Sequence, residues 1–193
     1  MNNTEIFCLP RLDAKARAEL RASYAGETGA VWIYRGILFI NYFRGIDGLD
    51  VFAETHLREE KRHLDLYEAQ IHRFRGSFLQ FGWMIAGFLV GALPVLLSKN
   101  WVYYTIYRVE SFVDIHYHNQ IESLSIVNSG SPNRENDGYE DCVRLFQDCH
   151  AAEIAHRDEA LDKMSARPGR VMTLWGDIVE MGSGLAVKLT KLL

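Results

Sequence analysis

Six acidic and histidine residues form a pattern that occurs twice along this chain: a lone glutamate followed by Glu-x-x-His. They are Glu27, Glu60, His63, Glu110, Glu153 and His156. Residues i and i+3 of a helix lie on one face, so each Glu-x-x-His can direct a carboxylate and an imidazole at one point. A four-helix bundle that places such groups between its helices can hold two metal ions. The doubled pattern therefore predicts a dinuclear metal site.

The kind of ligand narrows the choice of metal. Carboxylate oxygen together with imidazole nitrogen suits iron or manganese. Glu60 and Glu153 share their helices with the histidines, so we expect these two carboxylates to bridge the ions. Glu27 and Glu153 stand among small and apolar residues, and a buried carboxylate is costly unless it is paired or binds metal. One Glu-x-x-His arises easily by chance in a glutamate-rich helix, whereas two copies with matching glutamates do not.

Composition limits the class of protein. The 193 residues suit a single domain over 1–193, and a net charge of −4 without a basic tract argues against nucleic acid as a partner. The three cysteines, Cys8, Cys142 and Cys149, are an odd number without metal-binding spacing and fit a reducing compartment. Cys142 and Cys149 are seven residues apart, so we expect both to be buried on one helix face.

Hydrophobic periodicity and turn signals predict an all-α fold. Helices are expected over 13–40, 51–75, 101–126, 139–165 and 170–193. Gly45, Asp47 and Gly48 indicate a turn, and residues 128–138 are the clearest loop. We find no strongly alternating segment that would indicate a strand.

Segment 81–97 has no charged residue but contains three glycines and Pro94. Seventeen residues lie at the lower limit for crossing a bilayer. One interpretation is a buried or hairpin segment, bent at Pro94 and the glycines. The other, which we favour, is a surface that enters one leaflet of a membrane. Segment 170–193 carries a comparable apolar stripe and is expected to be a membrane-associated C-terminal helix.

Other histidines and aromatic residues are weaker candidates. His116 and Tyr117 follow Glu110 and could orient a metal ligand or contact substrate. The alternative is that they belong to an ordinary aromatic core. His56 and His72 are expected on the solvated surface, and His150 as a polar neighbour of Glu153.

The stretches around the six residues resemble the demethoxyubiquinone hydroxylases, the di-iron monooxygenases of ubiquinone biosynthesis. Each stretch is short, but together they cover about residues 12–193. The similar stretches are LRASYAGETGA (20–30), YRG (34–36), EKRHL (60–64), the glycine-rich apolar run 82–93, residues 109–121, and EIAHRD (153–158).

The resemblance implies a ferritin-like four-helix bundle with two iron ions, bound to the inner face of a respiratory membrane. It implies that O2 is activated at the irons and that one oxygen atom enters the ring of a polyprenyl benzoquinone. NADH would supply the electrons without a bound flavin. His116 and Tyr117 fall where the family has a His-Tyr pair near the irons. Other partners would be a lipid-binding accessory protein of ubiquinone biosynthesis and further copies of this chain.

The chain departs from the family pattern at three places. Tyr24 stands where the family usually has histidine, and Ala151 and Ala152 stand where it usually has acidic residues. The 128–138 loop is longer than usual. None of these departures removes an iron ligand, and they mark the chain as a divergent member.

Two rival hypotheses use the same residues. Another ferritin-like activity, such as peroxide reduction or iron oxidation, would need the same six ligands, although the apolar segment 81–97 argues against a soluble cage. A non-catalytic membrane-associated bundle would keep the motifs as a relic. The N-terminus has neither a basic start nor an apolar core. We therefore expect a peripheral protein on the cytoplasmic face of a bacterial inner membrane.

Overall fold

The computed structural model describes residues 13–129 and 139–192, and within them all regular secondary structure is helical. The elements are α1 (Ala14–Arg44), α2 (Leu49–Glu68), α3 (Ile71–Phe74), α4 (Gln80–Leu97), α5 (Lys99–Ser129), α6 (Tyr139–Asp162) and α7 (Arg170–Leu192). The predicted all-α fold is confirmed.

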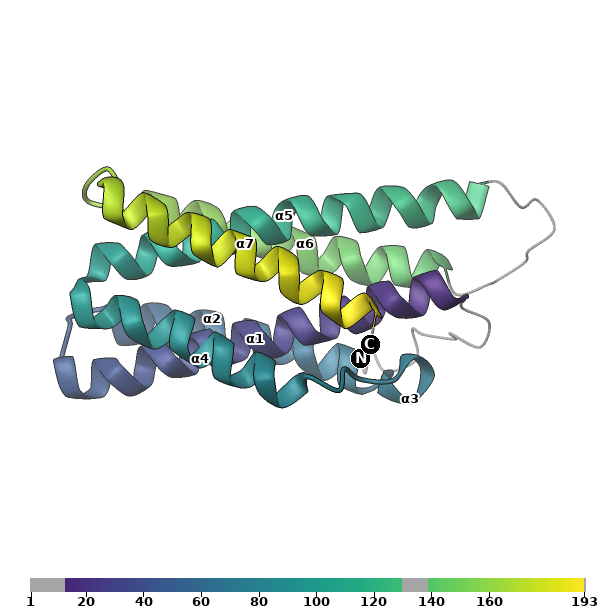
Figure 1. Cartoon of the computed structure of the whole chain (residues 1–193), viewed down its shortest axis with the longest axis horizontal. Helices are drawn as coiled ribbons and strands as arrows, with labels where there is room; N and C mark the ends of the chain where they lie inside the picture. The colour runs from purple at the N-terminus through teal and green to yellow at the C-terminus, as the bar shows by residue number, and fades with distance from the viewer. Residues whose placement is uncertain (1–12, 130–138, 193) are drawn as a thin grey trace.

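Four long helices form a bundle of two hairpins. Helix α1 packs on α2, and α5 packs on α6 (Figure 1). Helices α3 and α4 connect the two hairpins, and α4 lies along α1. Helix α7 returns across α5 and α1, so that α4 and α7 lie on the same side of the bundle (Figure 1). This is the ferritin-like arrangement with additional helices that the sequence predicted.

The ends of α1 are fixed by polar contacts close in sequence. Asp13 Oδ1 accepts a hydrogen bond of 2.8 Å from the Ala16 N–H, which caps the first turn. At the other end Gly45 has φ of 59°, a left-handed conformation that favours glycine. Asn41 Oδ1 then accepts a hydrogen bond from the Ile46 N–H at 2.9 Å. The turn predicted at Gly45–Gly48 is confirmed, and it brings α2 back along α1.

Several predicted boundaries differ from the observed ones. The helix expected over 51–75 ends at Glu68, where the N–H of Gln70 bonds to Tyr67 O and tightens the chain into a turn before α3. No glycine or proline marks this point, so the end of the helix could not be predicted there. Residues 128 and 129 of the expected loop belong to α5, and the remaining residues, 130–138, lie outside the described part of the chain.

The core consists of two apolar clusters separated along the bundle. One contains Leu20, Tyr24, Tyr67, Tyr117, Leu145, Phe146 and both buried cysteines. The other contains Tyr34, Ile37, Phe52, Val102, Ile106 and Val179. The prediction that Cys142 and Cys149 are buried is confirmed, because both side chains are fully covered. Each of the four bundle helices contributes residues to both clusters.

Helix α4 is continuous from Gln80 to Leu97 with Pro94 inside it, so the alternative of a hairpin segment is wrong. It is the one helix in the described part of the chain that is long and apolar enough to cross a membrane, and only 28% of the apolar window is buried. Its glycines bring it close to α1. A Cβ atom at Gly91 would lie 1.9 Å from Ile33 O, and one at Gly87 would lie 2.3 Å from Gly29 O.

We expect Gly91→Ala to destabilise the protein, because the new methyl group would push the backbone of α4 away from α1. Overpacking of this kind costs about 1–3 kcal/mol in the free energy of unfolding. The matched control is Gly82→Ala in the same helix, where a Cβ meets nothing within 4 Å. Urea denaturation measures the free energy of unfolding of both variants. Equal stability of the two variants would contradict the close α1–α4 contact.

Candidate metal centre

The six residues of the doubled pattern lie together in a layer between the two apolar clusters. Helix α1 supplies Glu27, α2 supplies Glu60 and His63, α5 supplies Glu110, and α6 supplies Glu153 and His156. On α1, for example, Leu20 and Tyr24 belong to one cluster and Tyr34 and Ile37 to the other, with Glu27 between them. The helical positions of the ligands therefore place all of them at one level of the bundle.

The layer contains two overlapping groups of potential ligands. In each group one atom per residue lies within 4.8 Å of the others. The groups are Glu27, Glu60, His63 and Glu153, and Glu60, Glu110, Glu153 and His156. Glu60 and Glu153 belong to both, which is the arrangement that two bridging carboxylates require.

The position of Glu153 illustrates this sharing. Its Oε1 lies 3.2 Å from His63 Nδ1, and its Oε2 lies 3.3 Å from His156 Nδ1. His156 Nδ1 also lies 3.1 Å from Glu60 Oε1. The two imidazoles thus face the carboxylates from opposite sides of Glu153.

The groups are buried, yet their inward atoms lack hydrogen bonds. Each of the six residues has 4% or less of its surface exposed. Both oxygens of Glu60, one each of Glu27 and Glu153, and Nδ1 of His63 and His156 have no hydrogen-bond partner among the described residues. Unsatisfied buried polar atoms are rare in proteins. Two divalent cations would satisfy these atoms and balance the four carboxylates, so the residues fit a dinuclear metal centre of the iron or manganese type.

Without metal, the site needs protons to balance its charge. Burial, followed by repulsion from Glu153, raises the pKa of Glu60 to about 8. Burial also raises the pKa of Glu110 well above its usual range. Burial opposes ionisation of Glu153, but the neighbouring His156 and His63 lower its pKa to about 2. Burial likewise opposes protonation of His63, but Glu153 and Glu27 raise its pKa to about 10. Metal would take the place of these protons.

Tyr117 contacts the layer from α5. Its hydroxyl donates a hydrogen bond to Glu27 Oε1 and lies 3.1 Å from the hydroxyl of Tyr67. This leaves Glu27 Oε2 as the oxygen without a partner. The tyrosine therefore sets the orientation of the Glu27 carboxylate, a role that supports a metal ligand. The ring of His116 instead stacks on Phe112, and its Nε2 has no hydrogen-bond partner among the described residues.

The second imidazole is held by a residue that the sequence analysis missed. His156 Nε2 lies 2.6 Å from Glu59 Oε2, which directs Nδ1 toward the layer. His56 was expected on the surface, and this prediction is wrong: its side chain is buried, with the ring stacked on Tyr34. Burial and the nearby His156 lower its pKa to about 4. The signal was available, since His56 lies four residues before Glu60 on the same helix face.

A further polar cluster joins α5 to α6 beside the layer. Asp114 Oδ1 lies 2.6 Å from His150 Nε2, and Asp114 Oδ2 accepts a hydrogen bond from Arg157. His150 thus has a carboxylate partner of its own, as a polar neighbour of the site rather than a member of it. Asp114 fixes the two helices that carry Glu110, Glu153 and His156.

The positions that depart from the family pattern do not face the ligands. The Tyr24 hydroxyl donates to Glu68 Oε1 at 3.5 Å, and its ring packs on Phe74. Ala151 is exposed and Ala152 is half-buried on α6. These departures therefore alter the surroundings of the site and leave its six ligand side chains in place.

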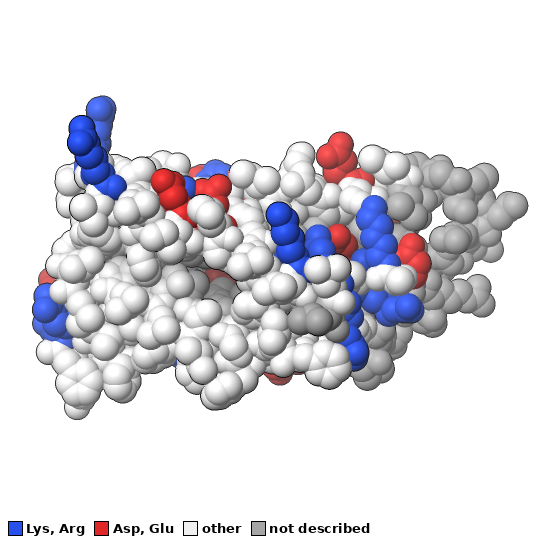
Figure 2. Space-filling view, viewed as in Figure 1, with Lys and Arg blue, Asp and Glu red and all other residues white. Residues whose placement is uncertain are grey.

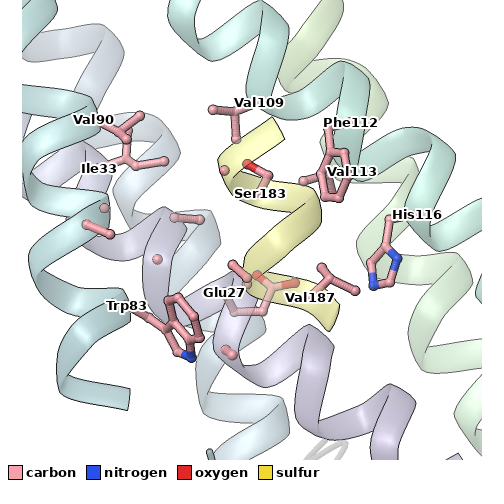
Figure 3. Close-up of a pocket in the computed structure, with 18 of the residues that line it drawn as sticks. Glu27, Ile33, Trp83, Val90, Val109, Phe112, Val113, His116, Ser183 and Val187 are labelled. Carbon is pink, nitrogen blue, oxygen red and sulfur yellow. The ribbon is translucent and has the colours of Figure 1, made fainter. Parts of the chain in front are cut away.

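An apolar cavity of roughly 350 Å³ reaches the carboxylates. Residues of α1, α4, α5 and α7 line it, and its wall includes the four glutamates of the layer. Figure 3 shows Glu27 pointing into the cavity between Trp83 of α4 and His116 of α5. In Figure 2 the surface is hollowed between α4 and α7. The cavity can place an apolar molecule directly against the layer.

The free energy of unfolding of the metal-free protein should fall as pH rises from 6.5 to 8. Glu60 holds its proton to about pH 8 in the folded state, whereas its ordinary pKa is 4.5. His63 holds its proton to about pH 10 in the folded state, whereas its ordinary pKa is 6.5, so the unfolded state releases that proton first. Both effects lower the free energy of unfolding as pH rises, by on the order of 1 kcal/mol per pH unit. Urea denaturation of chelator-treated protein at the two pH values measures the change.

The control for this prediction is Glu60→Gln, which keeps the shape of the side chain but has no proton to lose. Its stability should depend less on pH than that of the unaltered protein. An identical pH dependence in the two proteins would show that Glu60 is already ionised in the folded state. Added metal should reverse the trend, because metal binds the deprotonated ligands.

Comparison with known proteins gives one family. Residues 14–190 match the family model described as "Ubiquinone biosynthesis protein COQ7". The chain is 27% identical over 174 residues to the mouse protein named "NADPH-dependent 3-demethoxyubiquinone 3-hydroxylase, mitochondrial", covering 89% of this chain and 75% of the relative. The human protein of the same name is also 27% identical with the same coverage. A Rhodospirillum rubrum protein named "3-demethoxyubiquinol 3-hydroxylase" is 33% identical over 108 residues, 54% of this chain and 50% of the relative.

Proposed function

The chain belongs to the family of the ubiquinone biosynthesis protein COQ7, and we propose that it is a di-iron monooxygenase that hydroxylates the ring of a demethoxy polyprenyl benzoquinone. O2 would be the oxidant, and a reduced nicotinamide nucleotide would supply the electrons. The relatives carry names that specify hydroxylation of demethoxyubiquinone or demethoxyubiquinol.

One observation carries this proposal: unsatisfied carboxylates and imidazoles meet the end of an apolar cavity. Glu27, Glu60, Glu110 and Glu153 belong both to the ligand layer and to the cavity wall. A storage or detoxification site needs the ligands but has no use for an apolar cavity beside them. A hydroxylase with a lipid-like substrate needs both.

Each residue of the layer would have a distinct task. Glu60 and Glu153 would bridge the two irons, and His63 and His156 would bind one iron each. Glu27 and Glu110 would complete the two coordination spheres from α1 and α5. When bound, the irons supply the redox chemistry that reduces O2. The two apolar clusters on either side keep bulk water from the layer.

The cavity would hold the substrate. Its wall is mainly aliphatic and aromatic, as an isoprenoid quinone requires, and includes Ile33, Val90 and Val109. The quinone ring would lie against the carboxylate layer, with the tail directed toward the opening between α4 and α7. His116 carries an unpartnered Nε2 on this wall. We propose that His116 and Tyr117 assist the reaction from beside the irons, Tyr117 by orienting Glu27.

The electron donor is proposed as NADH. The mammalian relatives are named NADPH-dependent, so the two nucleotides should be compared directly. The described residues form no nucleotide-binding fold with a parallel sheet, since all their regular structure is helical. Electron delivery without a dedicated dinucleotide domain is part of the proposal.

We propose that α4 and α7 bind the protein to a membrane surface. Each helix has an exposed apolar row at helical spacing. The rows are Phe78, Phe81, Ile85, Leu89 and Leu93 before and along α4, and Val171, Leu174, Ile178, Met181 and Leu185 along α7. Figure 2 shows a face over α4 with few charged residues, and basic side chains beside the C-terminal end of α7.

Attachment to one leaflet fits the packing of α4 better than crossing does. Helix α4 lies along α1 at glycine contacts, so it cannot enter the bilayer without bringing α1 and its charged residues with it. The cytoplasmic face of a bacterial inner membrane is the proposed location. A lipid-binding accessory protein and a second copy of the chain are proposed partners.

We expect Glu153→Ala to abolish hydroxylation, because the variant loses a bridging ligand and leaves His63 and His156 without their shared carboxylate. The assay supplies a short-chain demethoxyquinone, O2 and NADH or NADPH, and mass spectrometry detects the product with one added oxygen atom. Turnover should fall by at least about 10²-fold, while far-UV circular dichroism still reports a helical protein.

The matched control is Asp148→Ala, which removes an exposed carboxylate from the same helix and should leave turnover unchanged. Unaltered activity of Glu153→Ala would contradict the metal-site assignment. Absence of product from the unaltered, iron-loaded protein, combined with rapid peroxide reduction, would favour the other ferritin-like activity.

We expect the double variant Leu89→Gln/Leu93→Gln to bind lipid vesicles at least about tenfold more weakly, because both side chains are exposed on α4. Co-sedimentation with phosphatidylethanolamine–phosphatidylglycerol vesicles measures the affinity. Leu161→Gln, an exposed leucine of α6, is the control and should bind as the unaltered protein does. Equal binding of all three proteins would contradict attachment through α4.

A further inference from the structure

A second group of histidine and carboxylate side chains lies on the outer side of the layer, between α2 and α6. It consists of His56 and Glu59 of α2 and Glu159 of α6. None of these residues belongs to the six ligands. His56, Glu59 and the inner ligand His156 each offer an atom within 4.8 Å of the others.

His56 is the member that indicates a ligand. The residue is 1% exposed, and neither ring nitrogen has a hydrogen-bond partner among the described residues. The ring is fixed by aromatic contacts, stacked on Tyr34 at 5.3 Å and tilted against Phe52 at 4.4 Å. A buried imidazole that is held rigidly by its neighbours, with neither nitrogen satisfied, is unusual for a structural histidine.

Each of the two neighbouring carboxylates lies close to His56, Glu59 within 4.8 Å and Glu159 in direct contact. His56 Nε2 lies 3.2 Å from Glu159 Oε2. Adjacent ligand atoms around a metal at about 2.1 Å are separated by roughly 3.0–3.4 Å. Glu59 bonds to His156 through Oε2, which leaves its second oxygen for a cation. Glu59 and Glu159 are half exposed, so they open the group to solvent.

We propose that His56, Glu59 and Glu159 form a peripheral site for a divalent cation, from which metal passes to the inner centre. The binding of the cation stands on these residues alone, whereas its transfer inward rests on the proposed function. His156 separates the two sites, with Nε2 facing Glu59 and Nδ1 facing Glu60 and Glu153. The peripheral site thus lies one imidazole ring from the dinuclear centre.

Two features would keep occupancy of the peripheral site transient. Cations on opposite sides of one imidazole repel each other, so filling of the inner centre weakens the outer site. Lys163 Nζ lies 3.4 Å from Glu159 Oε1 and competes for that carboxylate. A site that captures metal and then releases it inward must bind the metal weakly once the inner centre is filled. A permanent third metal site would not need to.

The test uses the purified full-length protein after chelation, titrated with Co2+ and followed by its visible absorption and by metal analysis. The unaltered protein should bind one more Co2+ per chain at saturation than Glu159→Gln or His56→Gln. In both variants the inner centre should reach full occupancy about tenfold more slowly. Glu159→Gln changes a half-exposed side chain, so its effect cannot be ascribed to misfolding. The controls are Glu54→Gln and His118→Gln, both exposed.

A second background separates the peripheral site from the inner centre. In Glu60→Ala/Glu153→Ala, which removes both bridging ligands, one weakly bound Co2+ should remain and should disappear when Glu159→Gln is added. Retention of that ion after Glu159→Gln would overturn the proposal. Equal stoichiometry and equal loading rates for the unaltered protein, Glu159→Gln and His56→Gln would also overturn it. Failure of the inner centre alone would appear as loss of tight Co2+ with the peripheral ion unchanged.

Discussion

The structure depends on a layer of four buried carboxylates that crosses the bundle between two apolar clusters. Desolvation of a carboxylate is expensive, and four of them within one layer repel one another. The layer can persist only with compensating positive charge, from protons in the metal-free state or from two cations in the metal-bound state. The apolar clusters supply the packing energy that holds the four helices at this level. This explains why the core is divided into two parts, each rich in large side chains such as Tyr67 and Tyr34.

The contact between α1 and α4 connects this layer to the surface. Gly87 and Gly91 allow α4 to lie against the backbone of α1, which leaves the other face of α4 exposed and its large side chains directed outward. The close packing of α4 on α1 also closes one side of the cavity that ends at Glu27 and Glu110. A single glycine interface therefore determines both the apolar exterior and the shape of the cavity. In a water-soluble bundle the exposed row on α4 would be a liability; next to a membrane it lies where a lipid-like molecule would reach the cavity.

The helices and the convergence of the six candidate ligands could both be predicted, because both follow from short-range periodicity. An i, i+3 pair such as Glu153 and His156 lies on one helix face whatever the rest of the fold does. Long-range packing was not predictable in the same way. His56 shares a helix face with Glu60, but its charged neighbours led to its assignment to the surface. Only the packing of α6 and of the Tyr34 ring against it shows that it is buried. The glycines of α4 left a bend open as an alternative, because their partner, the α1 backbone, lies more than 50 residues away in sequence.

The repeat in the sequence also conceals a difference between the two halves of the site. His156 Nε2 lies against the Glu59 carboxylate, which accepts a hydrogen bond from its N–H and so leaves Nδ1 as the nitrogen for a cation beside Glu60 and Glu153. His63 Nε2 instead lies 3.2 Å from Arg62 Nη2. A cation at Nδ1, the atom that faces Glu27 and Glu153, requires the N–H of this ring to be on Nε2. A guanidinium can only donate, so Arg62 opposes that arrangement. A cation replaces the Nδ1 proton on both rings, but only the half with His63 must also displace Arg62, so the half with His156 is the better prepared. The half with His156 is also the one beside His56 and Glu159. The hydrogen bonds of His156 and the proposed route of metal loading therefore favour the same side of the bundle.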